Sequence, residues 1–208
     1  MEREVTVMTM TVVGEAPAGL QRESADSGTV ERDCEARDTP WMNLLAFLVQ
    51  VTGSLHTDEG VDVMLLDFAK AFDKVPDRRL LLKLQAHGIT NKLLDWIRQW
   101  LRCRVRKVGI RGSLSDWIEV LSGFPQDSVL GPILFLVYIN DLDCGIDNWI
   151  LKFAGDTKLF GGMSTKSDGS RLQDDLSKLV QWSQEWQMLF NINKCSVMHI
   201  GNIQKYTR

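Results

Sequence analysis

The chain has 208 residues, of which 44% are hydrophobic, so it can bury one globular core. Its net charge of −3 is unevenly spread, because residues 1–40 hold nine acidic and four basic residues whereas residues 41–208 hold eighteen acidic and twenty basic ones. The apolar runs Asn43–Val51 and Val129–Ile139 are shorter than the roughly 20 residues of a membrane span, and the acidic start Met1–Glu4 is unlike a secretory signal.

The four cysteines are spread widely over the chain, with no Cys-x-x-Cys pair and no histidine at ligand spacing. They are Cys34, Cys103, Cys144 and Cys195. This spacing is typical of reduced thiols rather than of a zinc site or a disulfide framework. We therefore expect an intracellular protein, either cytoplasmic or nuclear.

The first third of the chain predicts an arm, a helix and a strand. Residues 1–40 are charged, lack aromatic residues and show no steady hydrophobic period, so we expect a disordered N-terminal arm. The alternation of Val and Thr in Val5–Val13 leaves a strand open there. Apolar spacing then predicts a helix over Trp41–Leu55, and the apolar run Val61–Leu66 predicts a buried strand that ends at Asp67.

Two helices follow the buried strand. Pro76 starts the first one and Gly88 stops it, and Thr90 caps a second one that runs to Leu101. The remaining elements, in chain order, are a hairpin over residues 105–120 with its turn near Gly112–Ser115, an apolar helix over Ser128–Leu142, a hairpin over Ile150–Phe160, an amphipathic helix over Asp168–Phe190 and a strand over Cys195–Ile200. This order predicts an α+β fold with helices packed on an antiparallel sheet.

Two carboxylates stand where such a fold can bring them together. The second hairpin has two apolar runs around Gly155-Asp156, which predicts a carboxylate at its tip, and Asp67 ends the buried strand. Two-metal phosphoryl transfer needs carboxylates that converge on one point, so we predict Asp67 and Asp156 to be metal ligands and catalytic residues. The alternative stays open, because an Asp in either place is also a common turn former or helix cap.

A basic strip in the middle of the chain is the second functional candidate. Six basic residues fall within fourteen positions without an acidic one, and tryptophans lie nearby. Such a strip can follow a phosphate backbone while aromatic rings stack on bases. It can equally be a solvated helix end and a charged edge strand, with Trp96 and Trp100 in the core. The residues that we predict to contact nucleic acid are Arg102, Arg104, Arg106, Lys107 and Arg111.

Several segments together resemble one known family. They are Val61–Val75, Leu80–Ile89, Trp96–Gly112, Ser122–Leu142, Ile150–Gly161 and Trp182–Gly201. With these motifs in this order, residues from about 40 to 201 resemble the reverse transcriptase domain of non-LTR retrotransposons, of the LINE-type, jockey-like group. The resemblance implies a right-hand polymerase palm with partial fingers, helices packed on a small antiparallel sheet, and RNA-templated DNA synthesis from deoxynucleoside triphosphates, an RNA template, a DNA primer and Mg²⁺.

The resemblance also implies roles for the matching residues. Asp67 and Asp156 would be palm aspartates that bind the metals. Phe72 would lie beside the incoming sugar, and Gln126 would contact the incoming nucleotide and the template. Lys194 would supply a cation near the leaving phosphate. A core aromatic for Phe72 and a solvated surface residue for Lys194 remain the alternatives.

The chain departs from this family in two motifs and in length. Gly155 stands where the family hairpin carries a first aspartate, and Asp127 stands where the family has glycine after Pro-Gln. Loss of a metal-binding carboxylate predicts a rate lower by several orders of magnitude, since each ~1.4 kcal/mol of lost transition-state binding costs about tenfold. About seven residues follow Gly201, so we expect the thumb to be missing.

The sequence therefore predicts three parts, namely an N-terminal arm over residues 1–40, a truncated reverse transcriptase domain over residues 41–201 and a short tail over residues 202–208. The predicted function is an RNA-directed DNA polymerase domain that is inactive or nearly so. Two alternatives stay open. One is a non-catalytic module that binds RNA or an RNA–DNA hybrid, and the other is a decayed element without a selected function.

Overall fold

The computed structural model describes residues 40–125 and 127–201, so most of the predicted N-terminal arm, the short tail and Gln126 lie outside the described residues. The helices are α1 (Pro40–His56), α2 (Ala71–Lys74), α3 (Asp77–Ala86), α4 (Asn91–Leu101), α5 (Leu130–Tyr138) and α6 (Lys166–Glu185). The strands are β1 (Gly60–Asp67), β2 (Val105–Arg106), β3 (Gly109–Ile110), β4 (Ser113–Leu114), β5 (Ile118–Glu119), β6 (Trp149–Phe153), β7 (Asp156–Met163) and β8 (Ser196–Ile200). Within this part of the chain, no helix is both long enough and apolar enough to cross a membrane.

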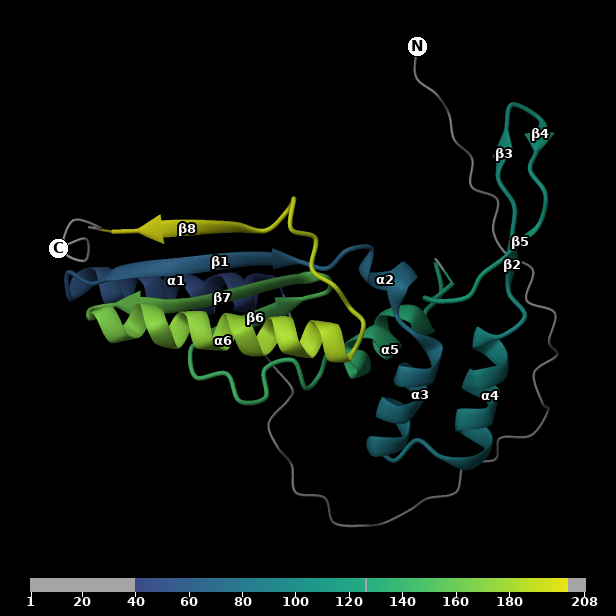
Figure 1. The fold of residues 1–208 in the computed structure, drawn as a ribbon, viewed down its shortest axis with the longest axis horizontal. Coiled ribbons are helices and arrows are strands. Elements are labelled where there is room, and N and C mark those ends of the chain that lie inside the picture. The colour runs from purple at the N-terminus through teal and green to yellow at the C-terminus, as the bar shows by residue number, and fades with distance from the viewer. Residues whose placement is uncertain (1–39, 126, 202–208) are drawn as a thin grey trace.

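Four strands form one antiparallel sheet in the order β6-β7-β1-β8. The apolar strand β1 is central, and its Val63 lies opposite Phe160 of β7 on one side and Met198 of β8 on the other. The four short strands form two further ladders, β2 with β5 and β3 with β4. These ladders make a hairpin that projects from the body of the molecule, and we call residues 105–119 the hairpin arm (Figure 1).

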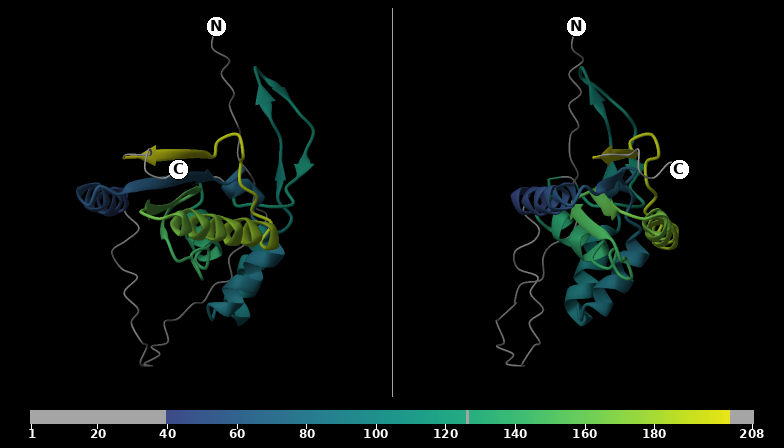
Figure 2. Two further views of the ribbon diagram at one scale, coloured as in Figure 1. Left: turned by 60° about the vertical axis from the view of Figure 1, so that its left-hand side comes forward. Right: turned by 90° about the vertical axis from the view of Figure 1, so that its left-hand side faces the viewer.

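Helices cover both faces of the sheet. Side chains alternate between the two faces along a strand, and Val63 of β1 packs toward Val51 of α1, whereas Leu66 belongs to a larger core on the other face. That larger core includes Leu172 and Leu179 of α6 together with residues of α3, α4 and α5. Figure 2 shows α1 and α6 on opposite sides of the strands. The α+β arrangement expected from the sequence is therefore present.

The second hairpin differs from its prediction in one respect that matters for the site. The sequence placed Asp156 at the tip, but the two-residue turn is Ala154-Gly155, and Ala154 adopts the positive φ of 48°. Pairing resumes at Asp156, which is the first residue of β7 and lies opposite Phe153. Asp156 is thus held in the ladder beside the turn.

Three other elements end or turn earlier than predicted. Helix α5 covers Leu130–Tyr138 rather than Ser128–Leu142. Helix α6 ends at Glu185, because the chain then turns so that Phe190 forms an antiparallel bridge with Phe68. The turn of the hairpin arm lies at Arg111-Gly112, where both residues have positive φ values of 49° and 84°. The short helix α2 was not predicted.

Candidate functional site

The β1–β7 ladder brings the two predicted carboxylates together. Asp67, the last residue of β1, lies directly opposite Asp156, the first residue of β7. Residues directly opposite each other in an antiparallel pair project on the same face, with Cβ atoms about 4.5–5.5 Å apart. The side chain of Asp67 is 20% exposed and that of Asp156 is exposed. A carboxylate pair at the end of the central strands is therefore a feature of the fold.

Gly155 lies beside this pair. Its carbonyl oxygen accepts a hydrogen bond of 3.1 Å from the backbone N–H of Phe68. A Cβ atom on Gly155 would lie 3.9 Å from Oδ1 of Asp67 and 3.3 Å from Cβ of Ala71. A carboxylate at position 155 would therefore stand next to Asp67, and glycine supplies none.

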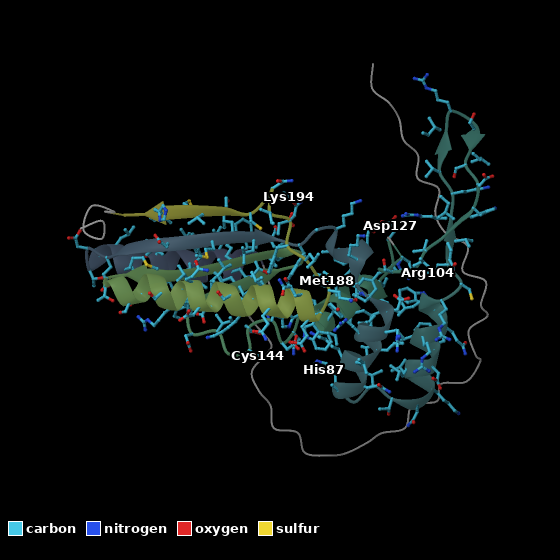
Figure 3. All side chains as sticks on the ribbon, in the orientation of Figure 1. His87, Arg104, Asp127, Cys144, Met188 and Lys194 are labelled. Carbon is cyan, nitrogen blue, oxygen red and sulfur yellow. The ribbon has the colours of Figure 1, made fainter. Side chains whose placement is uncertain are left out.

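A lysine completes the group. The Nζ atom of Lys194 lies 2.8 Å from Oδ2 of Asp67, and this ion pair joins the turn before β8 to the end of β1. Figure 3 labels Lys194 on that turn. Oδ2 of Asp67 is buried and accepts no well-formed hydrogen bond from the described residues, so its close partner there is the ammonium group. Pairing with Asp67, with a smaller contribution from Asp156, raises the pKa of Lys194.

The loop before α5 is hydrogen-bonded to α2 and to the residue that follows α2. The backbone N–H of Gly123 donates to the carbonyl of Val75 at 2.9 Å, and that of Phe124 donates to the carbonyl of Phe72 at 2.8 Å. Gly123 has a φ of 81°, and a Cβ there would come within 2.5 Å of the carbonyl oxygen of Phe72. Only glycine fits this close approach. The contact fixes the start of the Pro-Gln loop relative to the strand that carries Asp67.

Phe72 is half-buried and packs against two other aromatic rings. Its ring stacks on Phe135 with centroids 4.8 Å apart, and meets the edge of Phe124 at 6.3 Å. A core role is therefore established for Phe72, and its contact with a nucleotide sugar stays a prediction. Gln126 lies outside the described residues. Asp127, next to it, is exposed and has a φ of 59°, a conformation that suits glycine better.

The fold buries one residue of the basic strip and leaves the others accessible. Arg104 is 1% exposed; its Nε atom donates to the carbonyl of Leu101 at 2.7 Å, and its Nη2 atom lies 3.6 Å from Oδ1 of Asp77. Burial raises the pKa of Asp77 to about 6, although Arg104 opposes this rise. Arg104 is therefore an interior residue, which corrects its predicted place on a surface that contacts nucleic acid. No local sequence pattern indicated this burial, because Asp77 lies in α3 whereas Arg104 lies in the loop between α4 and β2.

The other members of the strip remain accessible. Arg102, Arg106 and Arg111 are exposed, and Lys107 is half-buried, with its Nζ atom 4.6 Å from the ring centroid of Trp117. Trp117 is itself 55% exposed. In contrast, Trp96 and Trp100 pack against the main core, as the alternative interpretation expected. The accessible cations and one accessible tryptophan thus lie on or beside the hairpin arm.

Sequence reasoning missed a second buried cation. Lys83 of α3 lies within 5 Å of the ring centroids of Tyr138, Trp182 and Trp186, and forms an ion pair with Asp141. Burial lowers the pKa of Lys83, although Asp141 opposes this change. This cluster ties α3 to α5 and α6. No local signal could have found it, since its members come from three segments that are far apart in the sequence.

Comparison with known proteins identifies the family of this arrangement. The family profile described as reverse transcriptase (RNA-dependent DNA polymerase) matches residues 41–207. The chain belongs to the reverse transcriptase family. The RNA-directed DNA polymerase from mobile element jockey of Drosophila melanogaster is 30% identical over 146 residues, covering 66% of this chain and 16% of that protein. The probable RNA-directed DNA polymerase from transposon X-element of the same species is 25% identical over 151 residues, covering 70% and 16%.

A solved structure supports the fold. The apo telomerase from Candida tropicalis, truncated from its C-terminal domain, aligns with a TM-score of 0.56 at 14% identity, over 79% of this chain and 36% of that one. This reverse transcriptase chain thus shares its fold with a telomerase and its sequence motifs with the polymerases of non-LTR retrotransposons. It spans about a sixth of the length of those curated relatives.

The acidic site does not fit the pair of divalent ions that reverse transcriptases generally use. Residues 40–125 and 127–201 contain no group of three or more Asp, Glu, His or Cys side chains that could hold a metal. Two carboxylates are present, and Asp67 is already paired with Lys194. Two metals about 3.5–4 Å apart need more carboxylate oxygens than this site offers.

Proposed function

We propose that this chain is an RNA-directed DNA polymerase domain of the non-LTR type whose polymerase site is inactive or nearly so. One observation carries the proposal. Position 155 points at Asp67, since a Cβ there would lie 3.9 Å from Oδ1, and the residue at this position is glycine. The fold thus keeps the place of a further carboxylate, whereas the sequence has lost the side chain.

The arrangement of the helices and strands supports a proposed organisation of the domain. The four-stranded sheet with Asp67 and Asp156 is the palm, and α3, α4 and the hairpin arm form part of the fingers. An RNA template, a DNA primer and a deoxynucleoside triphosphate would meet at the acidic end of β1 and β7. Asp127 adds a negative charge to the loop there, which opposes binding of a triphosphate. The absence of a thumb stays a prediction.

A primer-extension assay tests the proposal. The full chain is incubated with a primed RNA template, deoxynucleotides and either Mg²⁺ or Mn²⁺, beside the Asp67→Ala variant as the zero-activity control. We expect the two proteins to give the same background. Template-dependent extension by the unmodified chain that disappears in Asp67→Ala would refute the claim of inactivity.

A second candidate function is non-catalytic binding of RNA or an RNA–DNA hybrid. The observation that favours it is the hairpin arm, which projects from the body and exposes Trp117 beside Lys107, Arg106 and Arg111. Stacking on an exposed aromatic ring and contact with phosphates are the usual means of binding single strands. We expect weak, salt-sensitive affinity.

Filter binding at about 50 and 200 mM salt tests this candidate. The Arg106→Gln/Lys107→Gln double variant should lose affinity and show a smaller salt dependence. The matched control is Arg78→Gln/Lys92→Gln, which removes the same charges from exposed positions of α3 and α4. Equal affinities for the two double variants would exclude the hairpin arm as the binding surface.

A further inference from the structure

Lys194 is brought to the acidic site by the backbone as well as by its charge. The N–H of Asn191 donates to the carbonyl of Asp67 at 2.7 Å, and the N–H of Lys194 donates back to the carbonyl of Asn191 at 2.9 Å. Strand β8 then pairs with β1 from Ser196 onward. The turn that carries Lys194 is therefore attached to the same residue whose carboxylate the lysine contacts.

A residue of the chain itself partly balances the negative charge of this group. Asp67 and Asp156 lie on one face, and the ammonium of Lys194 is 2.8 Å from the buried Oδ2 of Asp67. A monovalent cation that belongs to the chain thus takes the position beside Asp67. A divalent ion at this carboxylate would have to displace the ammonium group or accept its repulsion.

We propose that Lys194 is the resident counter-ion of the Asp67–Asp156 pair and competes with divalent cations for Asp67. The inference rests on the proposed assignment of these two aspartates as the metal-binding acids. It goes further by naming the residue that lets the remaining acids coexist without a metal. Lys194 is then a positioning residue of the site, whatever its part in phosphate chemistry.

A simpler account treats Lys194 as a solvated surface residue, and its side chain is 66% exposed. Exposed ion pairs contribute little to stability. The two accounts differ in what a neutral residue at position 194 does. A surface lysine can be replaced without consequence for metals, whereas loss of a resident counter-ion leaves Asp67 open to another cation.

The test measures Mn²⁺ binding by electron paramagnetic resonance and the melting temperature with and without Mn²⁺, on the full chain. We expect Lys194→Gln to bind Mn²⁺ at least about tenfold more tightly than the unmodified chain. The substitution removes a unit positive charge that lies a few Å from the Mn²⁺ position and repels the divalent ion even when water screens the interaction. The melting temperature of Lys194→Gln should fall in chelator and recover in Mn²⁺. The unmodified chain and Lys194→Arg should show neither the tighter Mn²⁺ binding nor the Mn²⁺-dependent melting temperature.

Lys178→Gln is the matched control, because Lys178 is also an accessible lysine paired with a buried carboxylate, Asp175, at 2.7 Å. It should gain no response to Mn²⁺. The inference is overturned if Lys194→Gln and the unmodified chain bind Mn²⁺ equally. The Gly155→Asp variant distinguishes a failure of this inference from a failure of the assignment of Asp67 and Asp156 as metal-binding acids. If it binds Mn²⁺ while Lys194→Gln gains nothing, only this inference fails; if neither variant binds, the assignment of the site fails as well.

Discussion

Gly155 faces the carboxylate of Asp67, and a Cβ atom added to the glycine would lie 3.9 Å from Oδ1 of that aspartate. The backbone N–H of Phe68 donates to the carbonyl of Gly155, so the turn of one hairpin is held against the end of the central strand. This relationship supports the proposal that the residue at position 155 decides whether the site can hold its metals. The backbone is in place for a further carboxylate, and the side chain is missing.

A carboxylate at position 155 should be repelled by the carboxylates of Asp67 and Asp156. We expect Gly155→Asp to lower the free energy of unfolding by about 1–3 kcal/mol in chelator, because a third carboxylate joins Asp67 and Asp156. Gly155→Asn is the control, since it has the same size and meets Ala71 in the same way but carries no charge. Thermal unfolding should show that Mn²⁺ restores the Asp variant and not the Asn variant. Equal responses of the two would contradict a charge-based effect.

Asp127 adopts a left-handed conformation at an exposed position of the Pro-Gln loop. Because glycine reaches positive φ without the steric cost that other residues bear, Asp127→Gly should raise the free energy of unfolding by about 0.5–1 kcal/mol. Asp127→Ala should lower it, since alanine tolerates this conformation less well than aspartate. Urea unfolding of the three proteins gives the order. If the alanine variant matches the glycine variant, backbone conformation is not the cause.

The buried pair of Asp77 and Arg104 gives a dependence of stability on pH. Burial raises the pKa of Asp77 from 3.8 to about 6, so the folded protein keeps a proton that the unfolded chain has released. Stability therefore falls as pH rises from about 4 to about 6, by up to about 3 kcal/mol. We expect Asp77→Asn, which mimics the neutral form, to be more stable than the unmodified chain at pH 7.5 and similar to it near pH 4.5.

Urea unfolding at these two pH values checks the prediction for Asp77. Oδ1 of Asp77 and Nη2 of Arg104 are 3.6 Å apart and neither makes a hydrogen bond among the described residues, so the pair is held by charge alone. If the asparagine variant is the less stable protein at pH 7.5, the attraction of Arg104 outweighs the cost of burying the carboxylate.

Lys83 should be essential for packing α3 against α5 and α6. Its ammonium group pairs with Asp141 and lies 3.9 Å from the ring centroid of Trp186. Lys83→Met keeps most of the volume but leaves the half-buried carboxylate of Asp141 with the indole N–H of Trp182 and without its cation, so we expect a loss of about 3 kcal/mol. Lys92→Met, at an exposed position of α4, should change stability by less than about 0.5 kcal/mol. Tryptophan fluorescence in urea compares them, and equal midpoints would refute the role of Lys83.

The sequence predicted those features that depend on local periodicity. The apolar run that ends at Asp67 and the alternation around Gly155 were enough to place both strands of the acidic site, and the register then put Asp67 opposite Asp156. The turn residue Ala154 was not predicted, because a positive φ is unusual for alanine. The hairpin therefore carries its carboxylate one position beyond the turn.

Contacts between distant segments could not be predicted. Arg104 belongs to a run of basic residues that resembles a surface strip, and only the fold shows that it is buried against Asp77. The family resemblance placed Lys194 near the polymerase site, but its pairing with Asp67 depends on how β8 joins the sheet and could not be predicted. The hydrophobic periods of helices and strands show which face of its own element a residue lies on. They do not show which charged residue of another element it will contact.

The most direct test of the central claim is Asp67-dependent nucleotide incorporation in primer extension, measured for the unmodified chain and for the Gly155→Asp/Asp127→Gly double variant. Gly155→Asn/Asp127→Gly serves as the control without the added carboxylate. We predict that the unmodified chain incorporates no more than its Asp67→Ala variant and that the double variant exceeds both. Incorporation by the unmodified chain that Asp67→Ala abolishes would contradict the claim that Gly155 has silenced the site.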